Sequence, residues 1–258
     1  MSKQKPVALV TGGSTGIGLE LAKVFAAEGY DVIIASDNRN QLKKAAAQIA
    51  SAGDGDVVEI VVADLSKPTG AKKLYDAVKE LDRPVDVLAN NAGRGVWGDF
   101  ARETDLKEEL AMIQLNAASV VAVTKMFVGD MVRRGSGKIL ITASEASLAP
   151  TALMSIYAAT KAFVYSFALS LREELKDTGV TVTALLPGAT QTDFFLRAEM
   201  QDAKFVQEGK MADPAKVARD GYDALIRGDD HVVTPFKDRV MATVAKLVPD
   251  SWSVERVE

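Results

Sequence analysis

The stretch Val7-Ala8-Leu9-Val10-Thr11-Gly12-Gly13-Ser14-Thr15-Gly16-Ile17-Gly18 decides the fold. Its apolar run Val7–Val10 predicts a buried strand, and the pattern of Gly18–Glu28 predicts a helix directly after the glycines. Glycines at such a junction let the turn tighten and let the backbone approach a pyrophosphate, while the helix N-terminus offers free N–H groups. We therefore predict a dinucleotide site with contacts from this turn, at Gly12, Ser14, Thr15, Gly16, Ile17 and Gly18.

Strands and helices alternate along the rest of the chain. Further apolar runs predict strands at Val32–Ala35, Val57–Val62, Val85–Ala89, Lys138–Thr142, Val180–Leu186 and His231–Thr234. Helical patterns lie between them, at Asn40–Ser51, Thr69–Leu81, Leu106–Arg134, Ser155–Lys176 and Pro214–Ile226. Because the strand runs are continuously apolar, both faces of each strand are expected to be buried. The sequence predicts an α/β fold, a doubly wound Rossmann sheet of seven parallel strands with helices on both faces, in one domain over residues 1–258.

Composition excludes several classes of protein. With 48% hydrophobic and 26% charged residues, the chain has an ordinary globular composition, which argues against disorder. The net charge of -4 comes without a clustered basic face, so no nucleic-acid partner is expected. The absence of cysteine excludes disulfides and thiolate metal sites, and a single histidine, His231, argues against a Ser-His-Asp hydrolase or a His-ligated zinc centre. No metal is expected, and proton transfer falls to Tyr, Lys, Ser or a carboxylate.

The sequence shows no targeting or membrane-spanning segment. Residues Met1–Pro6 run straight into the first strand without the apolar core of a signal peptide. No uninterrupted apolar run reaches the roughly 18 residues that a membrane span needs. We expect a cytoplasmic enzyme without a membrane span.

A tyrosine and a lysine one helical turn apart are the strongest candidates for chemistry. In Tyr157-Ala158-Ala159-Thr160-Lys161 the phenol and the ammonium lie at positions i and i+4, on one face of a predicted helix. A cation beside a phenol favours the phenolate and is expected to lower the pKa of Tyr157, which suits general acid–base catalysis. Ser144 lies thirteen residues before the tyrosine, at the end of a predicted strand, with Ser147 and Thr142 as alternatives.

Acidic and amide side chains follow other strands, at the edge where ligands of open sheets collect. Asp37 follows the second strand, where a carboxylate can accept hydrogen bonds from an adenosine ribose and repel a 2′-phosphate. Arg39 argues the other way, because arginine accommodates a 2′-phosphate. We favour NAD over NADP, with helix capping by Asp37 as the alternative role of that residue. The remaining contacts, predicted after the third and fourth strands, are Asp64, Leu65, Asn91, Ala92 and Gly93, and Asn91 has the alternative role of tying strands together.

These motifs occur in an order that resembles a known family. They are Thr11-Gly-x-x-x-Gly16-Ile17-Gly18, Asn90-Asn91-Ala92-Gly93, Asn116, Ser144, Tyr157-x-x-x-Lys161 and Pro187-Gly188. The set resembles the short-chain dehydrogenase/reductase family in its compact form, from about Lys5 to Thr234. The residue pattern in Tyr157–Phe163 and Pro187–Phe195 is similar to that of a branch of broad-type reductases. Members of that branch usually carry arginine at the position of Asp37. That departure argues against the NADP preference common in the family.

The resemblance implies a role for each of these residues. Tyr157 would protonate a carbonyl oxygen or accept the alcohol proton, Lys161 would lower the pKa of the tyrosine and bind the nicotinamide ribose, and Ser144 would hydrogen-bond the substrate oxygen. Asn116 would hold a water that connects Lys161 to solvent, and its alternative role is that of a helix-kink residue. Cofactor contacts are implied at Tyr157, Lys161, Pro187, Gly188, Thr190 and Thr192, the last to the nicotinamide carboxamide.

The substrate end is expected to be mostly apolar. Bulky residues flank the expected nicotinamide site, and the predicted pocket residues are Trp97, Glu145, Met154, Phe194 and Phe195. They favour a hydrophobic ketone, aldehyde or secondary alcohol, although ordinary core packing also explains any one of them. Residues 189–212 are predicted to form a lid over the substrate, and residues 236–258 form a C-terminal tail whose amphipathic part predicts a helix.

We expect an NAD(P)-dependent oxidoreductase with a tyrosine as general acid/base. The alternative is a non-catalytic dinucleotide sensor on the same fold, which would have no need of Ser144, Tyr157 and Lys161. Epimerases and dehydratases on this fold tend to be longer, with an added substrate domain for which this chain has no room. The long helices Leu106–Arg134 and Ser155–Lys176 carry apolar residues in excess of what one sheet face buries, so a homodimer or homotetramer is predicted.

Overall fold

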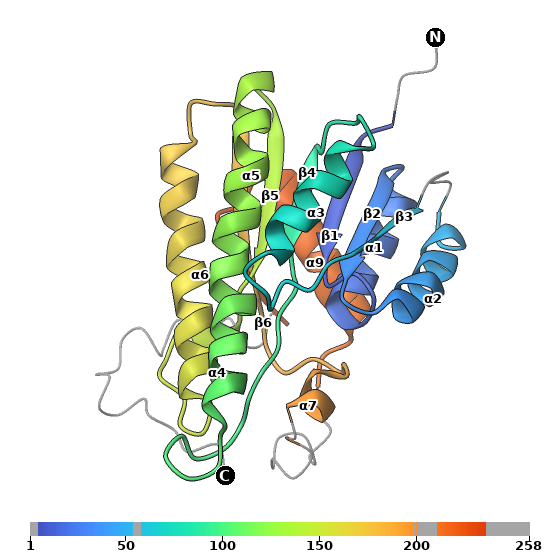
Figure 1. Ribbon diagram of the computed structural model, residues 1–258. Coiled ribbons are helices and arrows are strands. Elements are labelled where there is room, and N and C mark those ends of the chain that lie inside the picture. Colours follow the sequence, from blue (N-terminus) through green and yellow to red (C-terminus); the bar gives the residue numbers. More distant parts are fainter. Residues whose placement is uncertain (1–4, 54–57, 199, 201–210, 236–258) are drawn as a thin grey trace.

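The computed structural model describes residues 5–53, 58–198, 200 and 211–235 (Figure 1). Within them, seven parallel strands form one sheet in the order β3-β2-β1-β4-β5-β6-β7. The strands are β1 (Val7–Thr11), β2 (Asp31–Ser36), β3 (Val58–Val62), β4 (Val87–Asn90), β5 (Gly137–Thr142), β6 (Val180–Pro187) and β7 (His231–Thr234). Every predicted strand is confirmed, and the largest displacement is at the start of β4, which begins at Val87 rather than Val85.

The strand order reverses between β3 and β4. β1 pairs with β2 on one side and with β4 on the other, so that Val10 lies opposite both Ile34 and Ala89. In an open sheet this switch point leaves a crevice outside the carboxyl ends of the strands. The turns after β1 and β4 meet there, because Thr11 Oγ1 accepts hydrogen bonds from the backbone N–H groups of Asn91 (3.0 Å) and Ala92 (3.1 Å).

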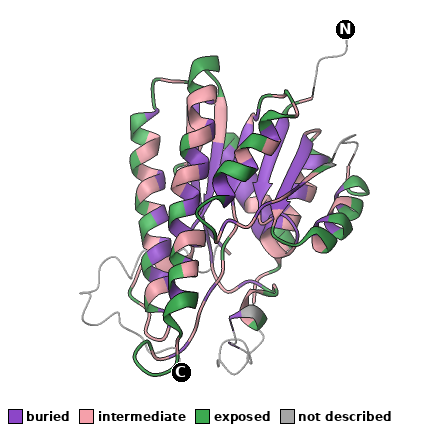
Figure 2. Ribbon diagram, in the orientation of Figure 1, coloured by how far each residue is buried: buried purple, intermediate pink, exposed green. Residues whose placement is uncertain are grey.

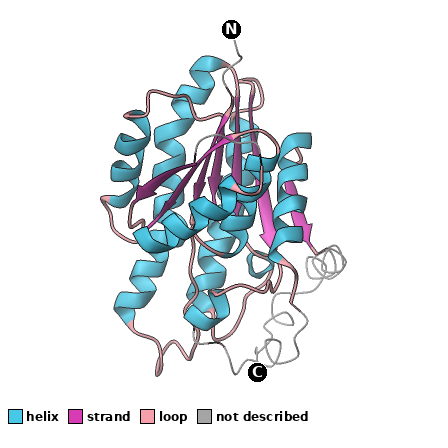
Figure 3. Cartoon of the chain, turned by 90° about the vertical axis from the view of Figure 1, so that its right-hand side faces the viewer, coloured by secondary structure: helices cyan, strands magenta, loops and turns pink. Residues whose placement is uncertain are grey.

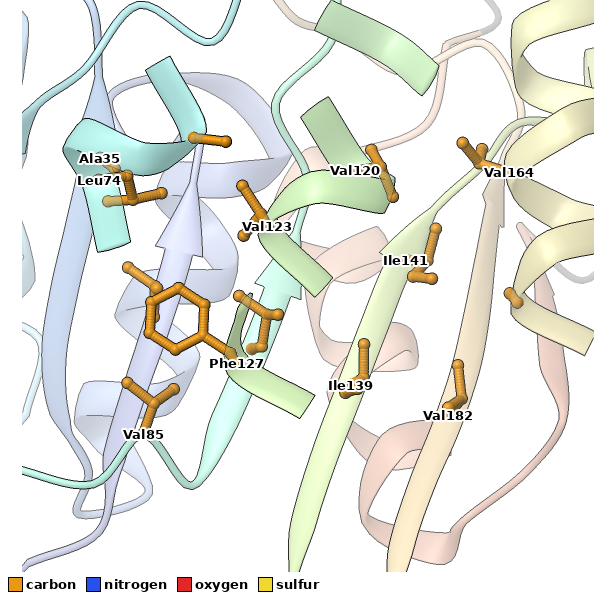
Figure 4. Close-up of a cluster of buried hydrophobic side chains, with 14 of the residues drawn as sticks. Ala35, Leu74, Val85, Val120, Val123, Phe127, Ile139, Ile141, Val164 and Val182 are labelled. Atoms are coloured by element: carbon orange, nitrogen blue, oxygen red, sulfur yellow. The ribbon is translucent and has the colours of Figure 1, made fainter. Parts of the chain in front are cut away.

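Helices cover both faces of the sheet, as predicted, and Figure 3 shows the strands running between the two helix layers. The long helices are α1 (Gly16–Ala27), α2 (Arg39–Ala50), α3 (Gly70–Lys79), α4 (Leu106–Ile113), α5 (Ser119–Arg134), α6 (Ser155–Glu174) and α9 (Pro214–Arg227). On one face, α3, α5 and α6 bury Leu74, Phe127 and Val164 against the strands (Figure 4). On the other face, α1 and α9 bury Phe25 and Leu225. The strands between these layers are largely buried (Figure 2), and each large apolar side chain removed from water contributes about 1.5–3 kcal/mol.

The helix predicted over Leu106–Arg134 is interrupted. A π-helical turn at Gln114–Ala118 joins α4 to α5, and it contains Asn116. Ser119 Oγ donates a hydrogen bond to the Leu115 carbonyl oxygen (2.6 Å) beside this turn. Single π-helical turns insert an extra residue into a helix and are frequent at functional sites. Asn116 therefore lies at an irregularity of the helix, and its role as a helix-kink residue stays a prediction.

The same run, Leu106–Arg134, is the one helical stretch of the described chain that is long and apolar enough to cross a membrane. Its most apolar window has a mean hydropathy of 1.5, and 44% of that window is buried inside the protein. Helices in protein cores pass the same test of length and composition, so this is weak evidence for a span.

Two short helices are not predicted from the sequence. One is the 3₁₀ turn η2 (Glu145–Ser147), and the other is α7 (Phe194–Arg197), which follows β6. A single turn is too short to show the 3.6-residue repeat of apolar side chains from which helices are predicted. Both short helices nevertheless border the functional site described below.

The two ends of the segment predicted as a lid, residues 189–212, are hydrogen-bonded to each other. The backbone N–H of Gln191 donates to the Ala212 carbonyl oxygen (2.9 Å), and the N–H of Ala212 donates to the Ala189 carbonyl oxygen (2.8 Å). Movement of this segment over a substrate stays a prediction. The predicted tail, residues 236–258, lies outside the described residues.

Candidate active site

A cavity of about 910 Å³ opens at the carboxyl edge of the sheet, with walls from the segments that follow β1 to β6. Most residues predicted for the site line it. They are Gly12, Ser14, Thr15, Gly16, Ile17, Asp37, Asp64, Leu65, Asn91, Ala92, Gly93, Trp97, Ser144, Glu145, Met154, Tyr157, Lys161, Pro187, Gly188, Thr190, Thr192, Phe194 and Phe195. Gly18, Arg39 and Asn116 do not line the cavity.

The turn after β1 is packed so closely that side chains are excluded from it. A Cβ on Gly12, whose φ is +66°, would lie 2.9 Å from Ala92 Cα. A Cβ on Gly18 would lie 2.2 Å from the Gly12 carbonyl oxygen, which explains why Gly18 serves packing and not the cavity wall. Thr15, the residue before α1, makes no side-chain capping hydrogen bond, so the first N–H groups of that helix remain available to an anion.

Asp37 follows β2 and contributes a carboxylate to the cavity wall. Its Oδ1 accepts a hydrogen bond from Ser36 Oγ (3.1 Å), which in turn accepts one from Ser14 Oγ (3.1 Å). Asn38, not Asp37, caps α2, through two backbone N–H groups at 3.0 and 3.1 Å from its Oδ1. The alternative role of Asp37 as a helix cap is therefore wrong. Arg39 is the first residue of α2 and lies outside the cavity wall.

Asn91 joins three strand ends in addition to lining the cavity. Its Nδ2 donates to the Thr11 carbonyl oxygen (3.3 Å), and its Oδ1 accepts a hydrogen bond from Thr142 Oγ1 (3.3 Å). These bonds connect the ends of β1, β4 and β5, which confirms the interpretation that Asn91 ties strands together. Amide side chains suit this task because they both donate and accept.

Tyr157 and Lys161 lie one turn apart on α6, and both are buried, with exposed fractions of 8% and 4%. Ser144, which follows β5, lines the same cavity, and its side chain favours ionisation of the Tyr157 phenol. The two alternatives to Ser144 are engaged elsewhere: Ser147 Oγ accepts from the Ser144 backbone N–H (3.3 Å), and Thr142 Oγ1 donates to Asn91. The structure thus brings the serine, the tyrosine and the lysine together in the cavity.

Burial dominates the ionisation of this pair. It raises the pKa of Tyr157 to about 12, with the hydrogen bond to Ser144 acting in the opposite direction, and it lowers the pKa of Lys161 to about 8. The prediction that the ammonium lowers the pKa of the phenol is therefore wrong in this structure. Lys161 Nζ lies 5.8 Å from the Tyr157 ring centroid and donates to the Thr142 carbonyl oxygen (2.9 Å), and desolvation by burial is the main cause of the raised pKa of the phenol.

Asn116 is hydrogen-bonded to the helix that carries Tyr157 and Lys161, although it does not line the cavity. Its Nδ2 donates to Thr160 Oγ1 (3.2 Å), and Thr160 Oγ1 donates to the Tyr157 carbonyl oxygen (2.7 Å). A Cβ on Gly93 would lie 3.3 Å from both Asn116 Oδ1 and Lys161 Nζ, so both groups flank that glycine. Sequence reasoning missed Thr160, although its position three residues after Tyr157 could have placed it on this turn.

The substrate end of the cavity combines an apolar wall with a charged rim. Met154 and Tyr157 are buried in one cluster, against which Trp97 and Phe194 pack. Arg94 and Gly95, in the stretch Gly93–Gly98 that the sequence places after the fourth strand, also line this end, and further lining residues that sequence reasoning did not assign are Glu103, Asp105, Glu108 and Ala198. Arg94 forms an ion pair with Glu108 at the rim. Loops that are far apart in sequence build this end, which is why no short motif marks it.

Comparison with known proteins agrees with this geometry. Residues 6–203 match the model of the short chain dehydrogenase family. An uncharacterised oxidoreductase of Bacillus subtilis, YvrD, is 35% identical over 191 residues, which cover 74% of this chain and 70% of that protein. Among solved structures, a short-chain dehydrogenase from Sphingobium yanoikuyae in complex with NADPH has a TM-score of 0.83 and 27% identity, covering 98% of each chain. A single-residue variant of the actinorhodin polyketide ketoreductase with NADPH has a TM-score of 0.80 and 29% identity, covering 91% of this chain and 97% of that one.

The parallel sheet with its switch-point cavity, the serine, tyrosine and lysine gathered in it, and the match over residues 6–203 lead to one conclusion: the chain belongs to the short-chain dehydrogenase/reductase family of oxidoreductases.

Proposed function

We propose that the protein is an NAD-dependent oxidoreductase that interconverts a hydrophobic ketone or aldehyde and its alcohol. The observation that carries this proposal is a single cavity that holds Tyr157 and Ser144 at one end and the glycine turn and Asp37 at the other. Hydride transfer and proton transfer can then take place in one space. The two solved relatives described with NADPH support a nicotinamide dinucleotide as the cofactor class.

The glycine end of the cavity fits a dinucleotide. Side chains are sterically excluded at Gly12, and the N-terminus of α1 presents uncapped N–H groups beside it, as pyrophosphate binding requires. Asp37 would bind the adenosine ribose, and Lys161 and Thr192 would hold the nicotinamide end. When bound, the cofactor supplies the hydride donor or acceptor.

Tyr157 would move the proton. In reduction its O–H bond breaks and the proton goes to the carbonyl oxygen as the carbonyl carbon accepts a hydride; oxidation runs in reverse. Ser144, which lines the same cavity as the phenol, would donate to the same oxygen and hold it within reach. With a pKa of about 12 the phenol stays protonated at neutral pH, which suits the acid role. Lys161, with a pKa of about 8, is the neighbouring group able to return a proton near neutral pH.

Replacement of Tyr157 by phenylalanine should remove the proton donor and leave the ring in place. We expect kcat/KM for ketone reduction to fall by about 10³-fold, within the range of acid–base catalysis, while the Kd for NADH stays unchanged. Tyr165→Phe is the matched control, because Tyr165 lies on the same helix and outside the cavity wall. Wild-type activity in the Tyr157 variant contradicts the mechanism. Cofactor binding by the wild type without turnover across a broad carbonyl panel favours a sensor instead.

Lys161→Met should abolish turnover and stabilise the fold at neutral pH. The folded-state pKa of about 8 lies below the ordinary 10.5, so burial of the ammonium destabilises the protein. The cost is fully present below pH 8 and decreases as the pH rises towards 10.5, because the unfolded chain then keeps a proton that the folded protein has lost. We expect the free energy of unfolding at pH 7 to rise by about 1–3 kcal/mol, less than the full shift because the bond to Thr142 is lost.

Urea unfolding at pH 7 and pH 9.5 measures this effect. The gain in the Lys161 variant should be smaller at pH 9.5, whereas Lys125→Met, at an exposed position of α5, should show no such dependence. A Lys161 variant that is less stable than the wild type at pH 7 would show that the lysine stabilises the fold, contrary to this account.

Asp37→Asn should weaken discrimination between the two cofactors. Loss of the carboxylate removes its repulsion of a 2′-phosphate, and we expect the ratio of Kd for NADPH to Kd for NADH to fall by about tenfold. Arg39→Ala is the control, because Arg39 lies outside the cavity wall and should leave the ratio unchanged. Fluorescence titration of the wild type and both variants with NADH and with NADPH measures the two Kd values. Tighter binding of NADPH than NADH by the wild type would contradict the assignment.

We also propose that the protein is a homodimer or homotetramer. Leu106, Leu110 and Ile113 share one face of α4, with exposed fractions of 68%, 55% and 38%, and Phe163 on α6 is 51% exposed. Apolar side chains grouped in this way are typical of protein interfaces. Light scattering after size-exclusion chromatography should give a mass of two or four chains, and Leu110→Glu should lower it. Particles of 27.5 kDa only would refute the proposal.

A further inference from the structure

Phe194 forms one wall of the cavity, directly beside the proposed acid. Its ring centroid lies 5.4 Å from that of Tyr157, with 56° between the ring planes, and 5.4 Å from that of Phe195. All three side chains line the cavity. A ketone whose oxygen reaches Tyr157 therefore presents one of its two substituents to this wall.

Gly95 leaves the space that the Phe194 ring occupies. A Cβ on Gly95 would lie 2.7 Å from Phe194 Cζ, closer than non-bonded carbon atoms approach, 3.2 Å from its Cε1, which is a tight contact, and 3.4 Å from the Ala198 Cβ. The φ of Gly95 is not in the left-handed region, so the backbone itself would accept an alanine. An alanine at this position would therefore fit only if the Phe194 ring moved.

The chain just before Phe194 rests on a second glycine. A Cβ on Gly16 in the cofactor turn would lie 3.0 Å from Thr192 Cγ2. Thr192 Oγ1 also accepts a hydrogen bond from the Phe194 backbone N–H (3.3 Å). The start of α7 is thus held between the glycine turn and the segment after β4, which restrains the Phe194 ring.

We propose that Phe194 and Gly95 are a specificity-determining pair that limits the size of the substrate group on one side of the carbonyl. This inference rests on the proposed function, since it assigns the substrate class of that same site. The ring fills volume beside the Tyr157 phenol, so a ketone with one small group, such as methyl, fits, and a ketone with two bulky groups does not. An alanine at position 95 would displace the ring rather than strain the backbone.

A double-mutant cycle with Phe194→Ala, Gly95→Ala and the double variant tests the pair. The substrates are phenyl ketones with methyl, ethyl and propyl as the second group. Phe194→Ala should raise kcat/KM for the propyl ketone relative to the methyl ketone by at least about tenfold, as expected for added room in an apolar pocket. Gly95→Ala should lower kcat/KM for the methyl ketone by about tenfold in the wild-type background and by less than about threefold once Phe194 is alanine.

Binding provides a readout that does not depend on turnover. Trp97 lines the cavity, so in a Trp252→Phe background its fluorescence reports the Kd of each phenyl ketone. The same preference for small groups, and the same relief in Phe194→Ala, should appear in these values. A wild type that binds the ketones with this size order but does not turn them over refutes the proposed reaction and keeps the specificity pair.

Leu196→Ala is the matched control, because Leu196 lies on the same short helix, is 61% exposed and lies outside the cavity wall. It should leave the size preference unchanged. Equal response of all ketones to Phe194→Ala, or strictly multiplicative effects of the Gly95 and Phe194 substitutions, would overturn the pairing.

Discussion

The contact between the turns that follow β1 and β4 is the constraint on which the rest of the site depends. Thr11 Oγ1 accepts two backbone N–H groups from the second turn, and a Cβ on Gly12 would collide with Ala92. Asn91 extends the junction to β5 through Thr142. Because this junction sits at the topological switch point, it sets the distance between the glycine end and the catalytic end of the cavity. A bulky residue in either turn would separate the two ends.

The same junction determines the electrostatics of the catalytic pair. Lys161 reaches across to the carbonyl oxygen of Thr142 at the end of β5, so its ammonium is satisfied by a strand end rather than by a carboxylate. Within the part of the chain that the structure describes, burial alone shifts this group, and its pKa falls to about 8, while burial also keeps the phenol beside it protonated. Such a pair costs stability, and under the proposed function it supplies the two groups that pass a proton. Rigid support is then necessary, and Thr160 and Asn116 provide it behind the helix.

The regular part of the fold could be predicted from the sequence, because continuous apolar runs and a glycine turn depend only on local periodicity. The motif residues could likewise be placed, since each follows the end of a strand or lies on the predicted helix over Ser155–Lys176. The sign of the Tyr157 pKa shift could not be predicted, because it depends on how deeply the phenol is buried and where Lys161 points. The π-helical turn at Gln114–Ala118 and the single turn of α7 leave no periodic signal either.

The candidate catalytic residues and the candidate substrate walls lie on different kinds of structure in this protein. Ser144, Tyr157 and Lys161 lie at a strand end and on a long helix, where packing fixes their positions. The walls proposed to meet the substrate come from the loop after β4 and the chain after β6. The sequence of such connecting segments can change without disturbing the sheet. Relatives near 30% identity therefore inform the reaction class far better than the substrate. The size and shape of the substrate have to be inferred from contacts within these loops, such as the one between a glycine and the edge of a phenylalanine ring.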